Sequence, residues 1–490
     1  MRRFSSIAAA MSTIGGAIAA ACVVTSSAAA DFEIAPCVID GADRSADCGR
    51  LHVFEDRATG RGRMIPIEFI RFHPGTDAAS KAPIYALTGG PGAGATRGAK
   101  GVLNSFAEFS DREIVIIDQR GTGKSNGLDC VRYDLESTPD AFQEMFEKPF
   151  FDPARFRSCM DELSKRADLR FYTTSLIADD IDDLRDALGH EQIILHGESY
   201  GTTLALEFIR RHGAHVRSAI LAGVAPPSIL HTETLAQDMD AMLEALFAAC
   251  EADAACNAAF PAFRREFREI ADRVRAAPIE VSLPHTLTNE PTLVRVRYPE
   301  LMIAVRYALY STRNSAGLPL AVHEAHGGDF RRLTALLPQL LFRLAEIGDE
   351  GMWASVRCAE EFPYIDDKAA RAAAADAYLG TERLDSGQAI CRFWPRGRAA
   401  ANFHQPVKSD VPALLLAGEV DAATPPWMAV ETAKHLANAE LVIVPNSSHW
   451  ELNGTACMET IMGVFLEKSA LGDEDRACLA AIMRPPFTLN

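Results

Sequence analysis

The chain lacks several features that would point to common classes of protein. It has no internal repeat and no long disordered linker, and no C-x-x-C pair occurs, so zinc-ribbon and dithiol redox roles find no support. Basic residues are scarce: 49 Lys and Arg stand against 66 Asp and Glu, a formal net charge of −17. Because phosphate binding needs clustered Lys and Arg, this balance argues against nucleic acid as a partner.

Long apolar runs are absent after the first thirty residues, so we expect no stable membrane span. The first thirty differ from the rest. A positive start at Arg2 and Arg3 precedes an apolar stretch over 7–24, and Ala28, Ala29 and Ala30 follow. This pattern is typical of a signal peptide at residues 1–30 and predicts a secreted or periplasmic protein.

Two alternatives to this simple export remain open. A membrane anchor is one, although the apolar stretch is short and is broken by Ser12, Thr13 and two glycines. A lipoprotein site at Cys22 is the other, but Ala stands where such a site would carry Leu, three residues earlier. We therefore rank both alternatives below cleavage and release.

The cysteine count agrees with export. Eleven cysteines are present, and loss of the signal peptide removes Cys22 and leaves an even ten, as an oxidised protein prefers. Connectivity cannot be fixed from sequence, but sequential pairing is the simplest hypothesis. It would join Cys37 to Cys48, Cys130 to Cys159, Cys250 to Cys256, Cys358 to Cys391 and Cys457 to Cys478.

Short apolar runs closed by turn residues, with helical patterns between them, predict buried parallel strands in an α/β sheet. Strands are expected at 63–72, 83–87, 113–117, 192–195, 218–223, 411–417 and 441–444, and helices at 174–188, 200–211 and 425–436. Between residues 228 and 405 the pattern turns mostly helical. We therefore expect a core formed by 31–227 and 406–490, interrupted by a helical lid over 228–405.

The strongest chemical signal is Gly197-Glu198-Ser199-Tyr200-Gly201, a G-x-S-x-G between a predicted strand and a predicted helix. Such a turn holds a serine hydroxyl exposed above the sheet. A serine needs a neighbouring base, and His449 lies in a loop after the last predicted strand. Asp421, at the end of the preceding strand, would orient that base. The sequence thus predicts a catalytic triad of Ser199, Asp421 and His449.

Acyl transfer also needs N–H donors for the oxyanion. One should be the backbone N–H of Tyr200, directly after the nucleophile. The other should come from the loop Thr88–Gly94 after an early strand, and Gly90 is the better candidate because Pro91 has no N–H. An ordinary flexible surface loop is the alternative for this segment.

The order of these motifs resembles the prolyl aminopeptidase family of α/β-hydrolases. The resemblance covers most of residues 50–490 and is least secure in the lid. The C-terminal part is similar to the secreted tripeptidyl-aminopeptidase branch. It implies an α/β-hydrolase fold, serine peptidase chemistry at a free N-terminus and a lid that shapes the pocket. The motifs are Gly89-Gly90-Pro91-Gly92, Asp118-Gln119-Arg120-Gly121-Thr122-Gly123-Lys124-Ser125, Gly197-x-Ser199-x-Gly201, Gly418-Glu419-Val420-Asp421, Ser448-His449, Cys457 and Arg484-Pro485-Pro486-Phe487.

One position departs from the family pattern, because Thr88 stands where intracellular prolyl aminopeptidases usually carry His. This weakens a strict specificity for proline. An enzyme that reads a free N-terminus must still hold an ammonium group, and a carboxylate should face it. Glu360 and Glu361, beside Cys358 in the lid, are the candidates for substrate binding, with Glu360 preferred; a solvated acidic pair is the alternative.

Other signals do not carry a function. Gly123-Lys124-Ser125 resembles the end of a phosphate-binding loop, but Asp118 occupies the position that requires glycine. His323 and His326 form H-E-x-H without a third ligand, so we expect neither a metal nor a cofactor. The leading hypothesis is a hydrolase that releases short pieces from the N-termini of peptides. An esterase with the same triad, and an inactive hydrolase fold that serves as a binding protein, remain the alternatives.

Overall fold

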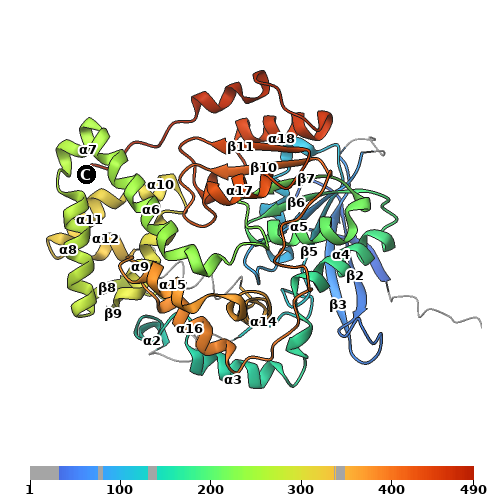
Figure 1. Cartoon of the computed structure of the whole chain (residues 1–490), viewed down its shortest axis with the longest axis horizontal. Helices are drawn as coiled ribbons and strands as arrows, with labels where there is room; N and C mark the ends of the chain where they lie inside the picture. Colours follow the sequence, from blue (N-terminus) through green and yellow to red (C-terminus); the bar gives the residue numbers. More distant parts are fainter. Residues whose placement is uncertain (1–31, 76–80, 131–140, 336, 338–347) are drawn as a thin grey trace, which may run out of the picture.

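The computed structural model describes residues 32–75, 81–130, 141–335, 337 and 348–490, so the predicted signal peptide lies outside the described residues. Nine strands form one sheet in the order β1-β2-β3-β5-β4-β6-β7-β10-β11 (Figure 1). Strands β5, β4, β6, β7, β10 and β11 pair in parallel, and β1, β2 and β3 add antiparallel pairs at one edge. The sheet is therefore mostly parallel, as the sequence predicts.

The strand bounds agree with the predicted runs to within a few residues, except at the N-terminal edge. There β1 and β2 form an antiparallel extension that the search for apolar runs missed. The exposed faces of β1 and the alternating burial of β2 explain the miss. The strands are β1 Phe32–Cys37, β2 Ala46–Phe54, β3 Met64–Phe72, β4 Ile84–Leu87, β5 Ile114–Ile117, β6 Ile193–Glu198, β7 Val216–Ala222, β10 Ala413–Gly418 and β11 Ala439–Val444.

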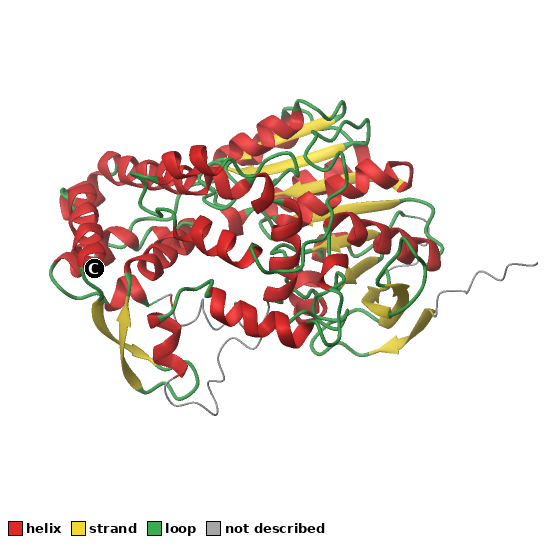
Figure 2. Ribbon diagram, turned by 60° about the horizontal axis from the view of Figure 1, so that its bottom comes forward, coloured by secondary structure: helices red, strands yellow, loops and turns green. Residues whose placement is uncertain are grey.

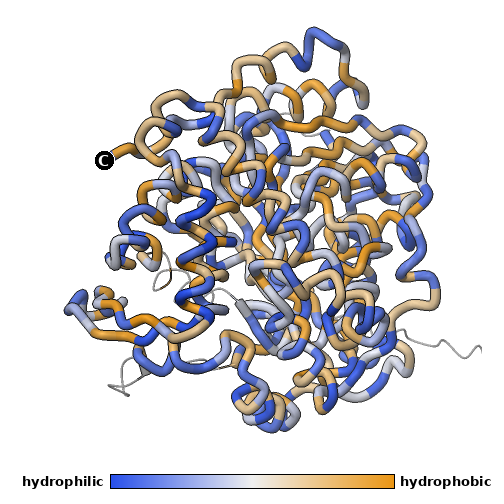
Figure 3. Tube along the Cα trace, turned by 60° about the vertical axis from the view of Figure 1, so that its left-hand side comes forward, coloured by the Kyte–Doolittle hydropathy of each residue, from blue (hydrophilic) through white to orange (hydrophobic). Residues whose placement is uncertain are grey.

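Helices cover both faces of this sheet. Side chains of α4 and α5 pack into one apolar cluster with one face, and side chains of α1 and α18 pack into another cluster with the opposite face. The central strands β4, β5 and β10 are buried along their whole length, which matches their uniformly apolar sequences. Figure 3 shows how hydrophobic and hydrophilic stretches alternate along the whole chain. These helices, with α17, span α1 Ala99–Asn104, α4 Thr174–Ala187, α5 Tyr200–His212, α17 Pro426–Ala433 and α18 Ala456–Lys468.

A mostly helical region separates β7 from β10 in the chain and lies beside the sheet (Figure 2). It contains one feature that the sequence analysis did not predict, the antiparallel hairpin of β8 Ile279–Pro284 and β9 Pro291–Val296. Its helices are α6 His231–Ala252, α7 Ala254–Ala259, α8 Phe263–Ala276, α9 Tyr298–Ala308, α10 Thr312–Ser315, α11 Leu318–His326, α12 Arg331–Thr334, α14 Glu350–Glu360, α15 Asp367–Ala374 and α16 Glu382–Cys391.

Packing does not follow the boundary that we predicted for the lid. Phe142 and Phe146 of α2 (Ala141–Glu147), far upstream, join the apolar cluster of α6, α8 and α9. Conversely, Met352 and Val356 of α14 join the cluster on the α4 and α5 face of the sheet. The lid is thus built from more than one stretch of chain, and part of it belongs to the core.

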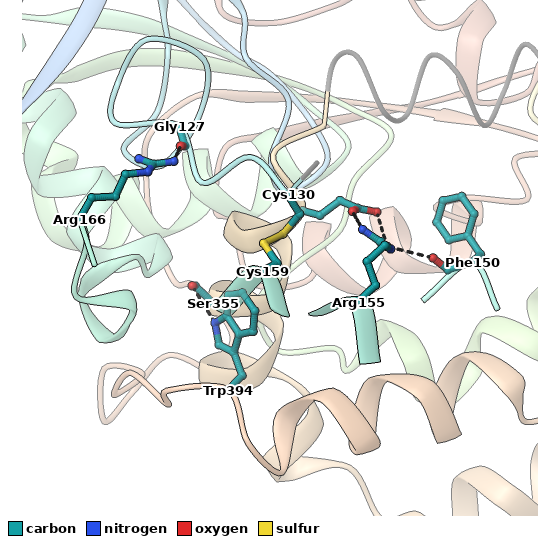
Figure 4. Close-up of a disulfide and its surroundings, with 9 residues drawn as sticks. Gly127, Cys130, Phe150, Arg155, Cys159, Arg166, Ser355 and Trp394 are labelled. Carbon is teal, nitrogen blue, oxygen red and sulfur yellow. Dashed lines mark hydrogen bonds and ion pairs between the residues drawn. A yellow bond between two sulfur atoms is a disulfide. The ribbon is translucent and has the colours of Figure 1, made fainter. Parts of the chain in front are cut away.

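Five disulfides connect the ten cysteines in the sequential pairs that the sequence suggested. Cys130–Cys159 ties the segment after β5 to α3 (Pro153–Leu163), next to Arg155 and to the Trp394 indole, which donates to Ser355 at 3.0 Å (Figure 4). Among the described residues, no helix has the length and apolar character that crossing a membrane requires.

Candidate active site

Ser199 stands at a sharp turn between β6 and α5. Its backbone has φ 55° and ψ −123°, a left-handed conformation that costs a non-glycine residue free energy and persists only where the surroundings enforce it. The Ser199 N–H donates to the Ala222 carbonyl of β7 at 2.9 Å, which anchors the turn to the neighbouring strand. The serine is therefore held at the carboxyl edge of the parallel strands.

The two glycines of this turn are required by close packing. A Cβ at Gly201 would lie 2.0 Å from the Leu87 carbonyl oxygen, and one at Gly197 would lie 2.5 Å from the Gly201 carbonyl oxygen. Any side chain there would push α5 away from β4. The G-x-S-x-G spacing is thus the sequence signature of strand, turn and helix packed at backbone contact.

Asp421 and His449 lie together at the same edge of the sheet. The His449 Nδ1–H donates to Asp421 Oδ2 at 2.8 Å, which leaves Nε2 as the acceptor. Burial would raise the pKa of the fully buried Asp421, but His449 and the backbone N–H groups of Thr424 and Ala423 hold that pKa below its usual value. Burial also opposes the imidazolium, yet the Asp421 charge raises the pKa of His449 above its ordinary value.

Thr424 completes this pair, and our sequence reasoning missed it. Its hydroxyl donates to Asp421 Oδ2 at 2.9 Å and lies 3.2 Å from His449 Nδ1, while its N–H donates to Asp421 Oδ1 at 2.9 Å. The spacing offered a signal, because an Asp followed three residues later by a Thr commonly bonds its own turn. Asp421 is thus fixed in one orientation from both sides.

The loop after β4 lies directly over the serine. A Cβ at Gly89 would be 3.0 Å from Ser199 Cβ and 3.6 Å from Ser199 Oγ. The loop is held in place by the Gln119 amide, which donates to the Thr88 carbonyl at 3.0 Å. Tyr200 is the first residue of α5, so its N–H has no partner within the helix. Both predicted oxyanion donors, Gly90 and Tyr200, line the same cavity as Ser199.

That cavity has a volume of about 1020 Å³ and lies between the edge of the sheet and the lid. Ser199, Tyr200, Gly90 and His449 line it, together with side chains of α6, α9, α14 and α16. The structure thus brings the predicted nucleophile, base and oxyanion donors to one solvent-accessible space. A hydroxyl, an oriented imidazole and free N–H groups around one space can perform acyl transfer.

Comparison with known proteins agrees with this chemistry. Residues 376–478 match a family described as TAP-like protein. Serine protease Hip1 of Mycobacterium tuberculosis is 24% identical over 452 residues, covering 86% of this chain and 84% of that protein. Tripeptidyl aminopeptidase of Streptomyces lividans is 29% identical over 249 residues, or 46% and 44% of the two chains. A proline iminopeptidase structure from Mycobacterium smegmatis superposes with a TM-score of 0.38 at 17% identity, covering 86% and 98%.

The chain has the α/β-hydrolase fold. The sheet, the serine turn and the sequence relatives together make it an enzyme of the serine peptidase type within that fold. The hydrolase also explains why one of its motifs matters for structure. Arg120, in the Asp118–Ser125 segment, is fully buried and forms two hydrogen bonds with Asp180 of α4, so this motif fastens the loop after β5 to the helix layer.

The lid of the hydrolase carries the two predicted substrate-binding acids. Glu360 and Glu361 both line the cavity, and both are 4% exposed. The Glu360 oxygens accept from the N–H and the hydroxyl of Thr174 at 2.7 and 2.6 Å. Burial raises the pKa of Glu360 to about 8. Burial acts the same way on Glu361, but Arg357 and His231 outweigh it and lower the pKa of that carboxyl.

The lid also holds the loop that carries the histidine. The Ser448 hydroxyl donates to the Leu309 carbonyl at 2.6 Å, and the Trp450 N–H donates to the Tyr310 carbonyl at 3.0 Å. The Tyr310 ring lies 5.3 Å from the His449 ring, measured between centroids. The residues that follow α9 therefore hold the loop that carries His449, a contact that the sequence gave no signal to find.

One group of potential metal ligands occurs in the described part of the chain, away from the cavity. Ligand atoms of Asp182, His212 and His215, from α4, the end of α5 and the turn after it, lie within 4.8 Å of one another. These side chains already contact one another: His215 Nδ1 is 2.7 Å and His212 Nδ1 is 3.4 Å from Asp182. None of the three lines the cavity. The H-E-x-H histidines are likewise paired, His323 with Glu266 and His326 with Glu269.

Proposed function

We propose that the chain is an exported serine aminopeptidase that releases short pieces from the N-termini of peptides. The observation that carries the proposal is a single cavity in which a strained serine and an Asp-oriented histidine face a lid wall with buried acids. A wholly apolar wall would favour small esters instead. The names of the relatives, a serine protease and a tripeptidyl aminopeptidase, point to the same class of substrate.

In the proposed reaction, Ser199 Oγ attacks the scissile carbonyl while His449 Nε2 takes its proton. The negative charge that develops on the carbonyl oxygen is stabilised by the N–H groups of Gly90 and Tyr200. His449 then gives the proton to the departing amine, which leaves an acyl-enzyme on Ser199. Water, activated by the same histidine, releases the N-terminal piece and restores the serine. Asp421 keeps the imidazole in the required tautomer throughout.

We propose that the substrate ammonium binds at the Glu360–Glu361 wall, with Glu360 as the primary partner. The hydrogen-bond partners of Glu360 belong to Thr174 and are neutral, whereas the charge of Glu361 is already matched by Arg357. An ammonium beside Glu360 would favour its ionised form, which burial alone disfavours. A charge-assisted contact of this kind is worth roughly 1.5 to 3 kcal/mol, or about ten- to a hundredfold in kcat/KM.

The test compares kcat/KM for matched peptides with free and N-acetylated N-termini, on wild type, Glu360→Gln and Glu361→Gln. Wild type should favour the free amine, and Glu360→Gln should lose most of that preference, because the Gln carbonyl can still accept from the Thr174 N–H but the side chain carries no charge. If wild type cleaved both peptides equally well, the proposed ammonium site would be contradicted and an endopeptidase would be favoured. Faster turnover of p-nitrophenyl esters than of any peptide would favour the esterase.

Export is the second part of the proposal. Five disulfides among the described residues fit an oxidising compartment. The n-region, apolar segment and Ala28–Ala30 of the sequence supply the expected leader. Cell fractionation with N-terminal sequencing should recover the mature protein outside the cytoplasm, beginning at Asp31. Recovery in the cytoplasm with an intact N-terminus would contradict export without affecting the catalytic proposal.

A further inference from the structure

Three arginines line the cavity that contains Ser199. They are Arg306, Arg357 and Arg383, from the lid helices α9, α14 and α16 that Figure 1 labels. Arg357 is paired with Glu361. Within the described part of the chain, neither Arg306 nor Arg383 has a hydrogen bond or an ion pair, and the Nε atoms of both are buried without a partner. Two guanidinium groups therefore line the cavity without a bonded acidic partner among the described residues.

Aromatic rings hold both side chains in place. The Arg383 guanidinium carbon lies 4.0 Å from the centroid of the Phe151 ring and 4.9 Å from that of Trp353. The Arg306 guanidinium carbon lies 5.0 Å from the centroid of the Tyr310 ring, which itself neighbours the His449 ring. Such a contact orients the guanidinium over the face of the ring. The N–H donors lie in the plane of the guanidinium itself and stay free for another partner.

The electrostatics show what these groups need. Burial, reinforced by Arg357 and Arg306, lowers the pKa of Arg383 to about 9. Cations held together out of bulk water are costly unless an anion compensates them. Glu361 is near enough to contribute, but its carboxylate is already bonded to Arg357 and to the Thr232 N–H. Among the described residues, no carboxylate is bonded to Arg306 or Arg383, so their N–H groups are available to an anion that enters the cavity.

We propose that Arg306 and Arg383 form a subsite for a carboxylate of the substrate. The planar guanidinium matches a carboxylate through two parallel hydrogen bonds, which a point charge cannot provide. This inference rests on the proposed function in taking the substrate to be a peptide. Two sources of the carboxylate fit a cavity of about 1020 Å³: the C-terminus of a short peptide, or an Asp or Glu side chain near the scissile bond.

The experiment measures discrimination between carboxylate and neutral isostere. One pair of peptides differs only in Glu against Gln within the released piece, and a second pair only in a C-terminal acid against the amide. Both pairs are assayed on wild type, Arg306→Gln, Arg383→Gln, Arg383→Lys and the control Arg371→Gln. Arg371 is an exposed lid arginine that is paired with Asp367 and lies outside the cavity lining, so its loss removes the same charge without touching the subsite.

We expect wild type to favour the carboxylate in at least one pair by about ten- to a hundredfold in kcat/KM. The pair that shows the preference identifies the source. Arg306→Gln and Arg383→Gln should bring the ratio close to one, and Arg383→Lys should give an intermediate ratio because lysine keeps the charge but not the planar fork. Arg371→Gln should keep the wild-type ratio.

Two results would overturn the subsite: no preference in either pair by wild type, or a preference that survives both glutamine variants. Circular dichroism and labelling by a serine-directed phosphonate establish that each variant is folded with a reactive Ser199. If a glutamine variant does not fold, Arg383→Lys still tests the subsite. An unchanged carboxylate preference in that variant would show that Arg383 does not bind the carboxylate through two parallel hydrogen bonds. N-acetylation of the same peptides tests the proposed ammonium site separately, so the aminopeptidase proposal can fail while the carboxylate ratio stands.

Discussion

At the scale of single residues, the candidate site could be proposed from spacing along the chain. Ser199 was predicted from its glycines, and His449 and Asp421 from their places after successive strands. What could not be predicted depends on contacts between distant segments. Thr424 is an exception, because its contact with Asp421 is local in sequence and was still missed. The arginines Arg306 and Arg383 come from different helices, and only the folded structure places them in one cavity.

The proposed triad gives the most direct prediction. Ser199→Ala, His449→Ala and Asp421→Asn should each lower turnover by about 10³- to 10⁶-fold, and double variants should lose little more than single ones, because the three residues act as a unit. Steady-state kinetics on one peptide substrate measures this. Near-normal turnover of Asp421→Asn would show that another group orients the histidine.

The pH profile gives a second prediction. The base must be neutral to accept the Ser199 proton, so activity should rise with pH through the raised pKa of His449. Glu198 contributes to that rise, and it accepts from the Asn453 amide at 2.8 Å. Glu198→Gln keeps this hydrogen bond but removes the charge. The acidic limb of kcat/KM should therefore move to lower pH, by roughly a few tenths of a unit for a partly exposed charge.

A matched control is Glu251→Gln, which removes an exposed lid carboxylate that is paired with Arg264 and lies outside the cavity lining. Its acidic limb should coincide with that of wild type. A shift of the Glu198→Gln limb to higher pH would show that Glu198 acts on the histidine by something other than its charge.

At the scale of secondary-structure elements, the apolar runs of the parallel strands were sufficient to place them. The same signal failed for β1 and β2, whose exposed or alternating residues do not form a run, and for the β8–β9 hairpin inside a region of helical periodicity. The involvement of α2 in the lid was equally hidden, since Phe142 and Phe146 reveal their partners only through packing. Pattern indicates the type of an element, but not its neighbours.

The third prediction concerns the buried ion pair between Arg120, in the loop after β5, and Asp180 of α4. Arg120 and Asp180 are both almost fully buried, and Arg120 Nη2 donates to Asp180 Oδ1 at 2.6 Å. Asp180→Asn would leave a buried guanidinium without its counter-ion, so the free energy of unfolding should fall by about 3 to 5 kcal/mol. Urea unfolding at neutral pH measures the change.

The control for this ion pair is Asp183→Asn on the same helix. Asp183 pairs with Arg57, and its side chain is 48% exposed, so solvent screening should limit the loss to about 1 kcal/mol or less. If Asp180→Asn and Asp183→Asn lowered the free energy of unfolding equally, burial would not determine how much the Arg120–Asp180 ion pair stabilises the fold.

At the scale of the whole molecule, the chain combines an excess of acidic residues with three arginines on the wall of its cavity. The formal net charge is −17, yet two of the arginines that face the cavity have no acidic partner among the described residues. The lid therefore does more than cover the serine. It supplies the charges that we propose for substrate recognition and, through Leu309 and Tyr310, it holds the loop that carries His449. Catalysis and lid stability should consequently change together.

The disulfides offer the test of this coupling. Cys358–Cys391 joins α14 to α16, the helices that carry Glu360 and Arg383, and closes a loop with a sequence separation of 33. Cys250–Cys256 closes a separation of only 6 at the outer end of α6. The entropy of the unfolded chain predicts a stabilisation of about 4 kcal/mol from the first bridge and about 2 kcal/mol from the second.

Replacing Cys358 and Cys391 by serine should thus lower the midpoint of thermal unfolding more than replacing Cys250 and Cys256. It should also raise KM, because the helices that form the cavity wall lose their covalent link, whereas the second variant should keep the wild-type KM. Mass mapping of the oxidised wild type should first recover all five sequential bridges and no free thiol. An unchanged KM in the Cys358→Ser, Cys391→Ser variant would show that packing alone holds α14 and α16 against the substrate, and the coupling between lid stability and catalysis would be refuted.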